Sequence, residues 1–199
     1  MKAEFVKSAA RPDHFTGEDL PEVAFVGRSN SGKSTLINAL TGQKRLAKAS
    51  NSPGRTQLIQ FFLINGSLSF ADLPGYGYAK VPESIRSSWR PMIETYLRVR
   101  ANLCLVVLVA DIRRDITNDE LLLIDWLTQY ERAVLVVLSK TDKLSANEQA
   151  LRMKKIRKAL SFLPPERICP YSAKTGKGRE QIWQSIGGIV QDFTKPAEE

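Results

Sequence analysis

Histidine and cysteine are scarce in this chain of 199 residues, which has one histidine and two cysteines. A structural zinc site needs four suitably spaced Cys or His ligands, so this class of site is excluded. A disulfide framework is not expected either, because Cys104 and Cys169 lie far apart in separate apolar segments. We predict two buried, reduced thiols in a reducing compartment.

The chain also lacks long hydrophobic runs. The longest, residues 103–110 and 133–138, are far shorter than the roughly 20 residues of a membrane-spanning helix. The N-terminus carries Lys2 and Lys7 but no apolar stretch typical of a signal peptide. We therefore expect a cytoplasmic protein that has no membrane partner.

Positive charge is in excess, with a formal net charge of +8. Most of the excess lies in two groups, Arg152, Lys154, Lys155, Arg157 and Lys158 in one, and Lys174, Lys177 and Arg179 in the other. A basic surface attracts polyanions such as RNA, and salt weakens the attraction. The alternative is that these residues form an ordinary solvent-exposed helix face that binds no polyanion.

Apolar runs of strand length alternate with helical patterns along most of the chain. Strands are predicted at 22–27, 57–64, 67–72, 103–110, 133–138 and 168–171, and helices at 32–40, 85–97, 118–130, 146–162 and 178–193. Asn65-Gly66 is a common signal for a hairpin turn. Buried strands alternating with helices predict an α/β fold with a mainly parallel six-stranded sheet, one antiparallel edge strand and helices on both faces.

The length of the chain suits a single domain. Residues 1–21 show no periodicity and are expected to form an N-terminal arm. Residues 22–194 are expected to form the domain, and residues 195–199 a short polar tail.

Residues 27–34 read G-R-S-N-S-G-K-S, which fits the phosphate-binding pattern G-x-x-x-x-G-K-[ST]. The pattern lies between a predicted strand and a predicted helix, as a phosphate loop requires. Its glycines let backbone N–H groups surround phosphate oxygens, Lys33 neutralises the β- and γ-phosphates, and Ser34 offers a hydroxyl to Mg²⁺. The predicted loop comprises Gly27, Arg28, Ser29, Asn30, Ser31, Gly32, Lys33, Ser34 and Thr35.

A second motif, Asp72-Leu73-Pro74-Gly75, ends the strand predicted at 67–72. A carboxylate in this position holds the metal ion of phosphate-loop proteins. Asp72 is therefore expected to bind Mg²⁺ through water, together with Ser34. Gly75 is expected to offer its backbone N–H to the γ-phosphate.

A third motif, Ser139-Lys140-Thr141-Asp142-Lys143, follows the strand at 133–138, and Tyr171-Ser172-Ala173-Lys174 ends the last strand. Asp142 can accept two hydrogen bonds from the N1–H and the exocyclic amine of guanine, a pair of donors that adenine lacks. A bidentate base contact contributes roughly 1–3 kcal/mol of discrimination. The stem of Lys140 would cover the plane of the base, so the two segments predict guanine selectivity.

Taken in order, G-R-S-N-S-G-K-S, S-P-G-R-T (52–56), D-L-P-G-Y-G-Y-A (72–79), S-K-T-D and S-A-K resemble the YihA/EngB family of bacterial GTPases, relatives of Era, EngA and MnmE. The resemblance covers about residues 20–193. It implies a single P-loop GTPase domain that uses Mg²⁺ and hydrolyses GTP to GDP and phosphate. It also implies an assembly factor for the large ribosomal subunit, with its rRNA and proteins as partners, and a link to cell division and septum formation.

The resemblance also assigns the switch segments. Switch I comprises Pro53, Gly54, Arg55 and Thr56, and Thr56 would meet Mg²⁺ and the γ-phosphate only in the GTP state. Switch II begins at Gly75, and Lys33, Thr56 and Gly75 are expected to act in catalysis. The alternative for Thr56 is an ordinary residue at the start of a strand.

Two positions, Tyr76 and Ser139, depart from the pattern of other GTPases, and a third, Asn30, bears on a second cation. Tyr76 stands where Ras-like proteins place a glutamine that orients water, so we expect slow unaided hydrolysis, with help from a partner or an ion. Asn30 matches a potassium ligand of MnmE-type proteins, which makes K⁺ a candidate second cation, unless Asn30 only caps the loop. Ser139 replaces the usual Asn or Thr and keeps a hydroxyl.

Two other functions are weighed against this monomeric GTP-dependent switch. A P-loop small-molecule kinase would clamp a second phosphate with Arg113, Arg114 or the arginines between Arg86 and Arg100. However, a kinase needs neither of the guanine-type motifs. A basic RNA-binding protein with a vestigial nucleotide site would explain the charge but not the intact phosphate and metal motifs.

Overall fold

The computed structural model describes residues 1–47, 58–75 and 83–195, without the side chains of residues 83–90. Its strands are β1 (Ala3–Ala9), β2 (Glu22–Gly27), β3 (Ile59–Ile64), β4 (Leu68–Asp72), β5 (Leu103–Asp111), β6 (Ala133–Ser139) and β7 (Ile168–Pro170). Its α-helices are α1 (Lys33–Thr41), α2 (Glu83–Val99), α3 (Asn118–Gln129), α4 (Ala146–Ala159) and α5 (Arg179–Thr194).

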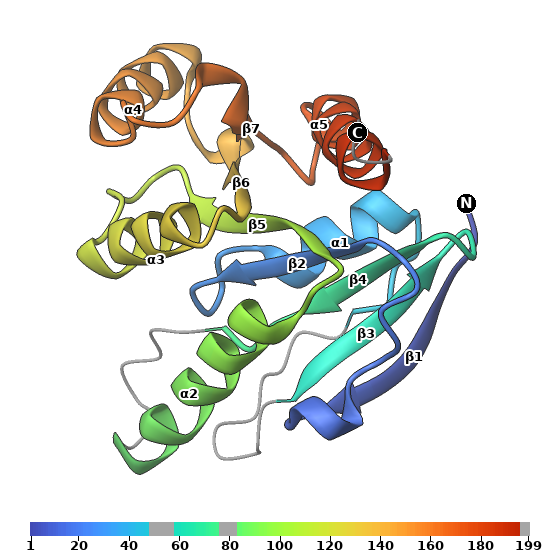
Figure 1. The fold of residues 1–199 in the computed structure, drawn as a ribbon. Coiled ribbons are helices and arrows are strands. Elements are labelled where there is room, and N and C mark those ends of the chain that lie inside the picture. The colour runs from blue at the N-terminus through green and yellow to red at the C-terminus, as the bar shows by residue number, and fades with distance from the viewer. Residues whose placement is uncertain (48–57, 76–82, 196–199) are drawn as a thin grey trace.

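The described strands form one sheet in the order β1-β3-β4-β2-β5-β6-β7 (Figure 1). β4, β2, β5, β6 and β7 are parallel, whereas β3 pairs antiparallel with both β1 and β4. The predicted α/β class with a mainly parallel sheet is confirmed. The strand count differs by one, seven instead of six, because part of the predicted arm forms β1, which pairs with β3 from Ala3↔Ile64 to Ala9↔Ile59.

Asn65 and Gly66 turn the β3–β4 hairpin, as predicted. Their φ angles of 49° and 72° lie in the left-handed region. Glycine has no Cβ to clash there, and asparagine enters this region more readily than most residues. The turn therefore brings β4 back alongside β3 and places Asp72 at the end of a central strand.

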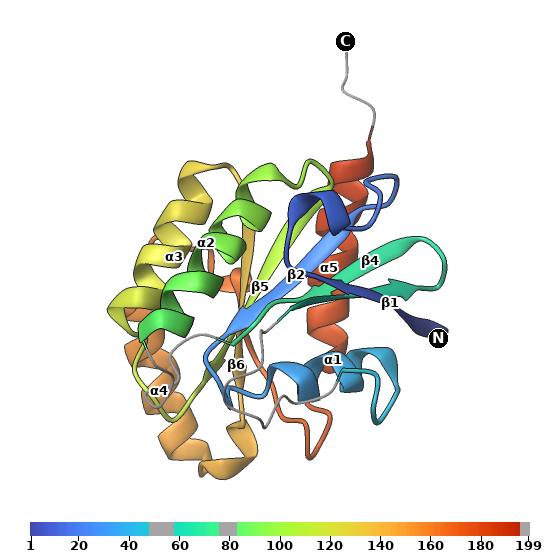
Figure 2. The ribbon, with the colours of Figure 1, turned by 90° about the horizontal axis from the view of Figure 1, so that it is seen from below.

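Hydrophobic side chains alternate between the two faces of the central strands. On β5, Val106 and Leu108 belong to the core that also contains residues of α2, α3 and α4, and Val107 and Val109 to the core that contains residues of α1 and α5. Figure 2 shows the same division, with α1 and α5 on one side of the sheet. Among the described residues, no helix combines the length and apolar character that crossing a membrane requires.

Capping boxes fix the starts of α3 and α4. Thr117 accepts a hydrogen bond from the backbone N–H of Glu120, whose side chain accepts one in return from the backbone of Thr117. Ser145 and Glu148 make the same exchange at α4. Because each box satisfies backbone groups that a helix start leaves free, it also fixes the loop that leads into the helix.

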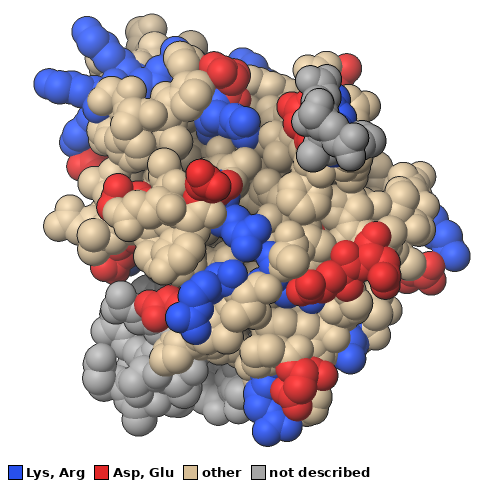
Figure 3. Space-filling model, in the orientation of Figure 1, with Lys and Arg blue, Asp and Glu red and all other residues tan. Residues whose placement is uncertain are grey.

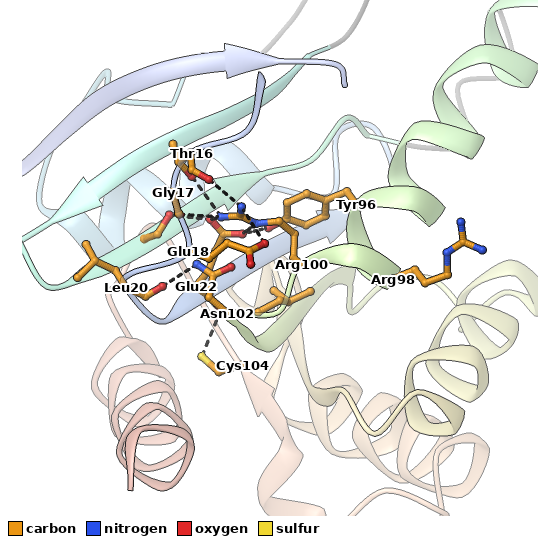
Figure 4. A network of polar contacts seen from close by, with 12 residues as sticks. Thr16, Gly17, Glu18, Leu20, Glu22, Tyr96, Arg98, Arg100, Asn102 and Cys104 are labelled. Carbon is orange, nitrogen blue, oxygen red and sulfur yellow. Dashed lines mark hydrogen bonds and ion pairs between the residues drawn. The ribbon is translucent and has the colours of Figure 1, made fainter. Parts of the chain in front are cut away.

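A buried polar network joins the start of β2 to the end of α2 (Figure 4). Arg100 donates to Glu22 from Nε and from Nη2, each at 2.8 Å, and the Tyr96 hydroxyl donates to Glu22 at 2.6 Å. Burial, followed by the charge of Glu22, raises the pKa of Tyr96 well above its ordinary value, so the hydroxyl stays protonated. Arg100 also donates to the Thr16 carbonyl at 2.8 Å, which fastens the segment before β2 to the domain.

Candidate functional site

The predicted motifs lie at the carboxyl ends of the parallel strands. Residues 28–32 connect β2 to α1, Asp72 ends β4, and Ser139 ends β6. The strands after β2 lie on both of its sides, β4 on one and β5 on the other. α/β proteins bind ligands in the crevice beside such a reversal of strand order.

The backbone of the predicted phosphate loop requires its glycines. A Cβ on Gly27 would lie 2.5 Å from the Val109 carbonyl oxygen, and Gly32 has a φ of +101°. Asn30 is also left-handed, with a φ of 64°. Gly32 precedes α1 without any side-chain cap, so the first N–H groups of the helix face the loop as an anion-binding set.

Lys33 and Asp72 contact each other beside this loop. The Lys33 ammonium donates to the Asp72 carboxylate, and their side chains are 11% and 5% exposed. The parallel register of β2 and β4 places Phe25 opposite Asp72 and so brings the carboxylate to the loop. The site therefore holds a buried cation and a buried anion that neutralise each other when no other charge is present.

The hydroxyl of Ser34 and the carboxylate of Asp72 are hard oxygen donors of the type that Mg²⁺ prefers. Among the described residues, no group of three or more His, Cys, Asp or Glu side chains could hold a metal ion without further ligands. Mg²⁺ is commonly held by one or two protein oxygens together with the phosphates of a substrate. The residues present fit that arrangement.

Gly75 lies directly against the phosphate loop. A Cβ at this position would be 3.2 Å from the Ser29 backbone nitrogen, and the Ser29 hydroxyl donates to the Gly75 carbonyl at 3.4 Å. Leu73 is joined to β2 by a backbone hydrogen bond to Phe25 at 3.0 Å. The predicted switch I residues, Pro53 to Thr56, and Tyr76 lie outside the described residues.

The last residue of β6 and the residue after it are joined to the phosphate loop by two direct hydrogen bonds. Ser139 Oγ donates to the Ser31 carbonyl at 2.5 Å, and Lys140 Nζ donates to the Asn30 carbonyl at 2.6 Å. Lys140 has a φ of 63°. Its left-handed backbone sends the side chain back toward the loop, so the first and third motifs form one site.

The segment after β7 completes the edge of this site. Ser172 Oγ donates to Asp142 Oδ1 at 2.8 Å, and the Thr141 backbone N–H donates to the Tyr171 carbonyl at 3.2 Å. The side chain of Asp142 is 11% exposed, whereas Ala173 is exposed. The Lys143 ammonium also lies 4.0 Å from Asp142 Oδ2. A carboxylate with these two partners that is still reached from outside suits recognition of a ligand edge.

The sequence prediction missed Asp111, the last residue of β5. Its carboxylate accepts hydrogen bonds from Arg113 Nη2 at 2.7 Å and from Lys140 Nζ at 3.0 Å. Burial alone would raise the pKa of this carboxyl, but the hydrogen bonds from Arg113 and Lys140 outweigh it and hold the pKa well below the ordinary value. The available signal was an aspartate at the end of an apolar run, the same placement that identified Asp72.

Two arginines of the kinase alternative have structural partners, and the side chains of Arg86 and Arg90 lie outside the described ones. Arg113 is bound to Asp111, and Arg100 is buried against Glu22. Arg114 lines a hollow beside the phosphate loop together with Arg28. Neither Arg100 nor Arg113 is available in this structure to clamp a second phosphate.

Comparison with known proteins agrees with this geometry. Residues 22–140 match the family described as "50S ribosome-binding GTPase". The chain is 49% identical to the probable GTP-binding protein EngB of Geobacter metallireducens over 99% of this chain and 96% of that protein. It is 54% identical to the protein of the same name from Syntrophus aciditrophicus over 94% of each.

Solved structures show the same fold. A crystal structure of a probable GTP-binding protein EngB superposes with a TM-score of 0.71 at 25% identity, covering 86% of this chain and 99% of that one. Era, solved with MgGDPNP and a segment of 16S ribosomal RNA, has a TM-score of 0.65 at 24% identity over 90% of this chain and 58% of that one, a likeness of fold. Because the family model matches residues 22–140 and both relatives align over nearly the whole of this chain, the chain belongs to the EngB family of GTP-binding proteins and is a GTPase.

Proposed function

We propose that the carboxyl edge of the sheet binds GTP and GDP, with the phosphates on residues 27–35 and the base against Asp142. The observation that supports this most directly is that the separate motifs are bonded into one site. Ser139 and Lys140 donate to the phosphate loop, and Ser172 donates to Asp142. These bonds hold a phosphate-binding and a base-binding segment in a fixed relation, which positions both ends of one nucleotide.

In this proposal the charges at the site rearrange when a nucleotide binds. The phosphates replace Asp72 as the partner of Lys33 and leave the carboxylate free for Mg²⁺ and its waters, beside Ser34. Mg²⁺ supplies neutralisation of charge on the phosphates. Gly75 offers its N–H near the γ-phosphate, and Thr56 is proposed to sense the same phosphate. With Tyr76 in place of glutamine, the protein is proposed to hydrolyse GTP slowly on its own.

Nucleotide binding can be measured with fluorescent GDP and ATP analogues. Lys33→Ala is expected to lower GDP affinity roughly 10- to 100-fold, the loss of charge-assisted hydrogen bonds. Lys44→Ala, an exposed lysine just beyond α1, is the matched control and should bind normally. Asp142→Asn is expected to shift preference toward xanthine nucleotides. Equal affinity for GDP and ATP in the unmodified protein would contradict the proposed guanine site.

We further propose that the protein works in the cytoplasm as an assembly factor for the large ribosomal subunit, through the outer face of α4. Arg152 and Lys155 pair with Asp115 at 2.6 and 2.8 Å. Lys154, Arg157 and Lys158 are exposed, and within the described part of the chain they make no ion pair or hydrogen bond. In Figure 3, basic side chains project from the corner that α4 occupies in Figure 1. This charge suits rRNA phosphates.

Sedimentation with ribosomal subunits tests the assembly role. The protein is expected to sediment with the large subunit or its precursor, and the comparison includes GDP, a non-hydrolysable GTP analogue and no nucleotide. Replacing Lys154, Arg157 and Lys158 with alanine should weaken binding and lower the slope of log affinity against log salt by roughly one per residue, while GDP affinity is kept. Binding to any RNA regardless of nucleotide would reduce the proposal to general electrostatics.

Two narrower proposals follow from the family resemblance. Asn30 is proposed to contribute to a K⁺ site beside the phosphates, and its exposed side chain and left-handed backbone leave it able to do so. A link to cell division and septum formation stays a prediction of the resemblance, and the monomeric state stays a separate prediction.

A further inference from the structure

Asp111 connects segments that the proposed nucleotide site uses separately. It ends β5, pairs in register with Ser139 of β6, and is 8% exposed. The Ile112 backbone N–H donates to the Ser139 carbonyl at 3.1 Å, which keeps the ends of the two strands together beyond the sheet. The Asp111 carboxylate is therefore held on a rigid element next to the base-binding segment.

Arg113 fixes the orientation of this carboxylate. Its Nε donates to Asp111 Oδ1 at 2.9 Å and its Nη2 to Oδ2 at 2.7 Å, and its backbone N–H donates to Oδ1 at 3.1 Å. Two parallel bonds from a guanidinium set both the position and the plane of a carboxylate. The Oδ2 atom is thereby directed at Lys140.

Lys140 lies between two acceptors from different parts of the fold. Its ammonium donates to the Asn30 carbonyl at 2.6 Å and to Asp111 Oδ2 at 3.0 Å. A lysine side chain has several freely rotating bonds and loses rotamer entropy when it is fixed. With both acceptors in place, this ordering is complete before any nucleotide arrives.

We infer that Asp111 is a positioning residue for guanine recognition, which holds the stem of Lys140 where the plane of the base is to lie while Asp142 contacts the edge of the base. The inference rests on the proposed nucleotide site. It separates two contributions to affinity: Lys140, ordered by Asp111, contacts the ring, and Asp142 contacts the exocyclic amine and N1–H.

This separation predicts a specific pattern of affinities for GDP and inosine diphosphate, which lacks the exocyclic amine. Asp111→Ala is expected to lower the affinity for both nucleotides by the same factor. The factor is roughly three- to tenfold, as for the loss of a charge-assisted hydrogen bond to a partly exposed lysine. Asp142→Asn should instead reduce the preference for GDP over inosine diphosphate. Asp115→Asn, which removes two ion pairs of the same loop that do not involve Lys140, is the matched control and should change neither affinity.

A double-mutant cycle distinguishes positioning from a general structural effect. In a Lys140→Ala background, Asp111→Ala should cause no further loss of GDP affinity, because the side chain that it orders is gone. If Asp111→Ala does not fold, the isosteric Asp111→Asn replaces it in the same cycle, with a smaller expected loss. Additive losses, or full affinity in Asp111→Ala while Asp142→Asn loses its preference, would overturn the inference. An unchanged preference in Asp142→Asn would instead overturn the proposed site itself.

Discussion

The buried pair of Arg100 and Glu22 allows a quantitative prediction about stability. The side chain of Arg100 is 2% exposed and that of Glu22 is fully buried. Arg100→Met removes the guanidinium and leaves the carboxylate with the hydroxyls of Tyr96 and Ser69, at 2.6 and 2.9 Å, as its side-chain donors. Breaking a buried ion pair from one side destabilises a protein by about 3–5 kcal/mol, because the remaining charge has lost its counter-ion.

This loss is a large part of the total stability of a domain, about 5–15 kcal/mol. For a chain of this size it corresponds to a fall in Tm of roughly 6–20 °C. Urea unfolding followed by circular dichroism, with and without GDP, measures the loss of unfolding free energy. Because the network lies at the amino end of β2, away from the phosphate loop, GDP affinity of the folded variant should stay unchanged.

Two control variants make the reasoning testable. Arg98→Met changes an exposed arginine near the end of the same helix, which points away from the network in Figure 4, and should cost less than about 0.5 kcal/mol. A variant with both Glu22→Leu and Arg100→Met leaves no unpaired charge and should lose less than the sum of the two single losses. A free energy of unfolding of Arg100→Met within about 1 kcal/mol of that of the unmodified protein, or additivity of the two losses, would contradict a coupled buried ion pair.

Three further predictions concern the site and the core. Gly75→Ala is expected to weaken the binding of a GTP analogue by about tenfold and that of GDP only slightly. The reason is that the added Cβ would press on Ser29 and shift the N–H proposed for the γ-phosphate. Equal losses of affinity for both nucleotides in a binding titration would contradict this role. GTP turnover is expected to be faster in KCl than in NaCl, with the difference lost in Asn30→Ala, and equal rates in the two salts would dispose of the potassium proposal. Burial raises the pKa of Cys104 to about 11 and also raises that of Cys169, so neither thiol should react with a thiol reagent at pH 8 until urea unfolds the protein; rapid reaction in the native state would contradict their burial.

The motifs that converge at the carboxyl edge of the sheet could be recognised in the sequence because they depend on local pattern. The phosphate loop, Asp72 and Asp142 follow apolar strand-length runs, and the carboxyl ends of parallel strands meet at one edge, so their convergence could be expected. The two cysteines were predicted to be buried for the same kind of reason, and both are.

The parts that were missed depend on partners distant in the sequence. β1 buries only its two end residues, so it has no alternating pattern to recognise, and its partner β3 begins at Ile59. In the sequence, nothing distinguishes Arg100 from several other basic residues. Its role is visible only in the fold, which places Glu22 from the start of β2 beside it. Asp111 becomes informative only once β6 places Lys140 beside it.

The pairing of β1 with β3 also has a consequence for synthesis of the chain. β1 is made well before β3 exists to pair with it, so a nascent chain carries an unpartnered strand in which Phe5 and Val6 stay 53% and 50% exposed even after folding. Such a strand is a template for wrong pairing with other chains. Lys2 and Lys7 lie just before and within it, and charged side chains at the edge of a sheet discourage that pairing. The first residues of the protein thus combine a late-forming edge with protection against aggregation.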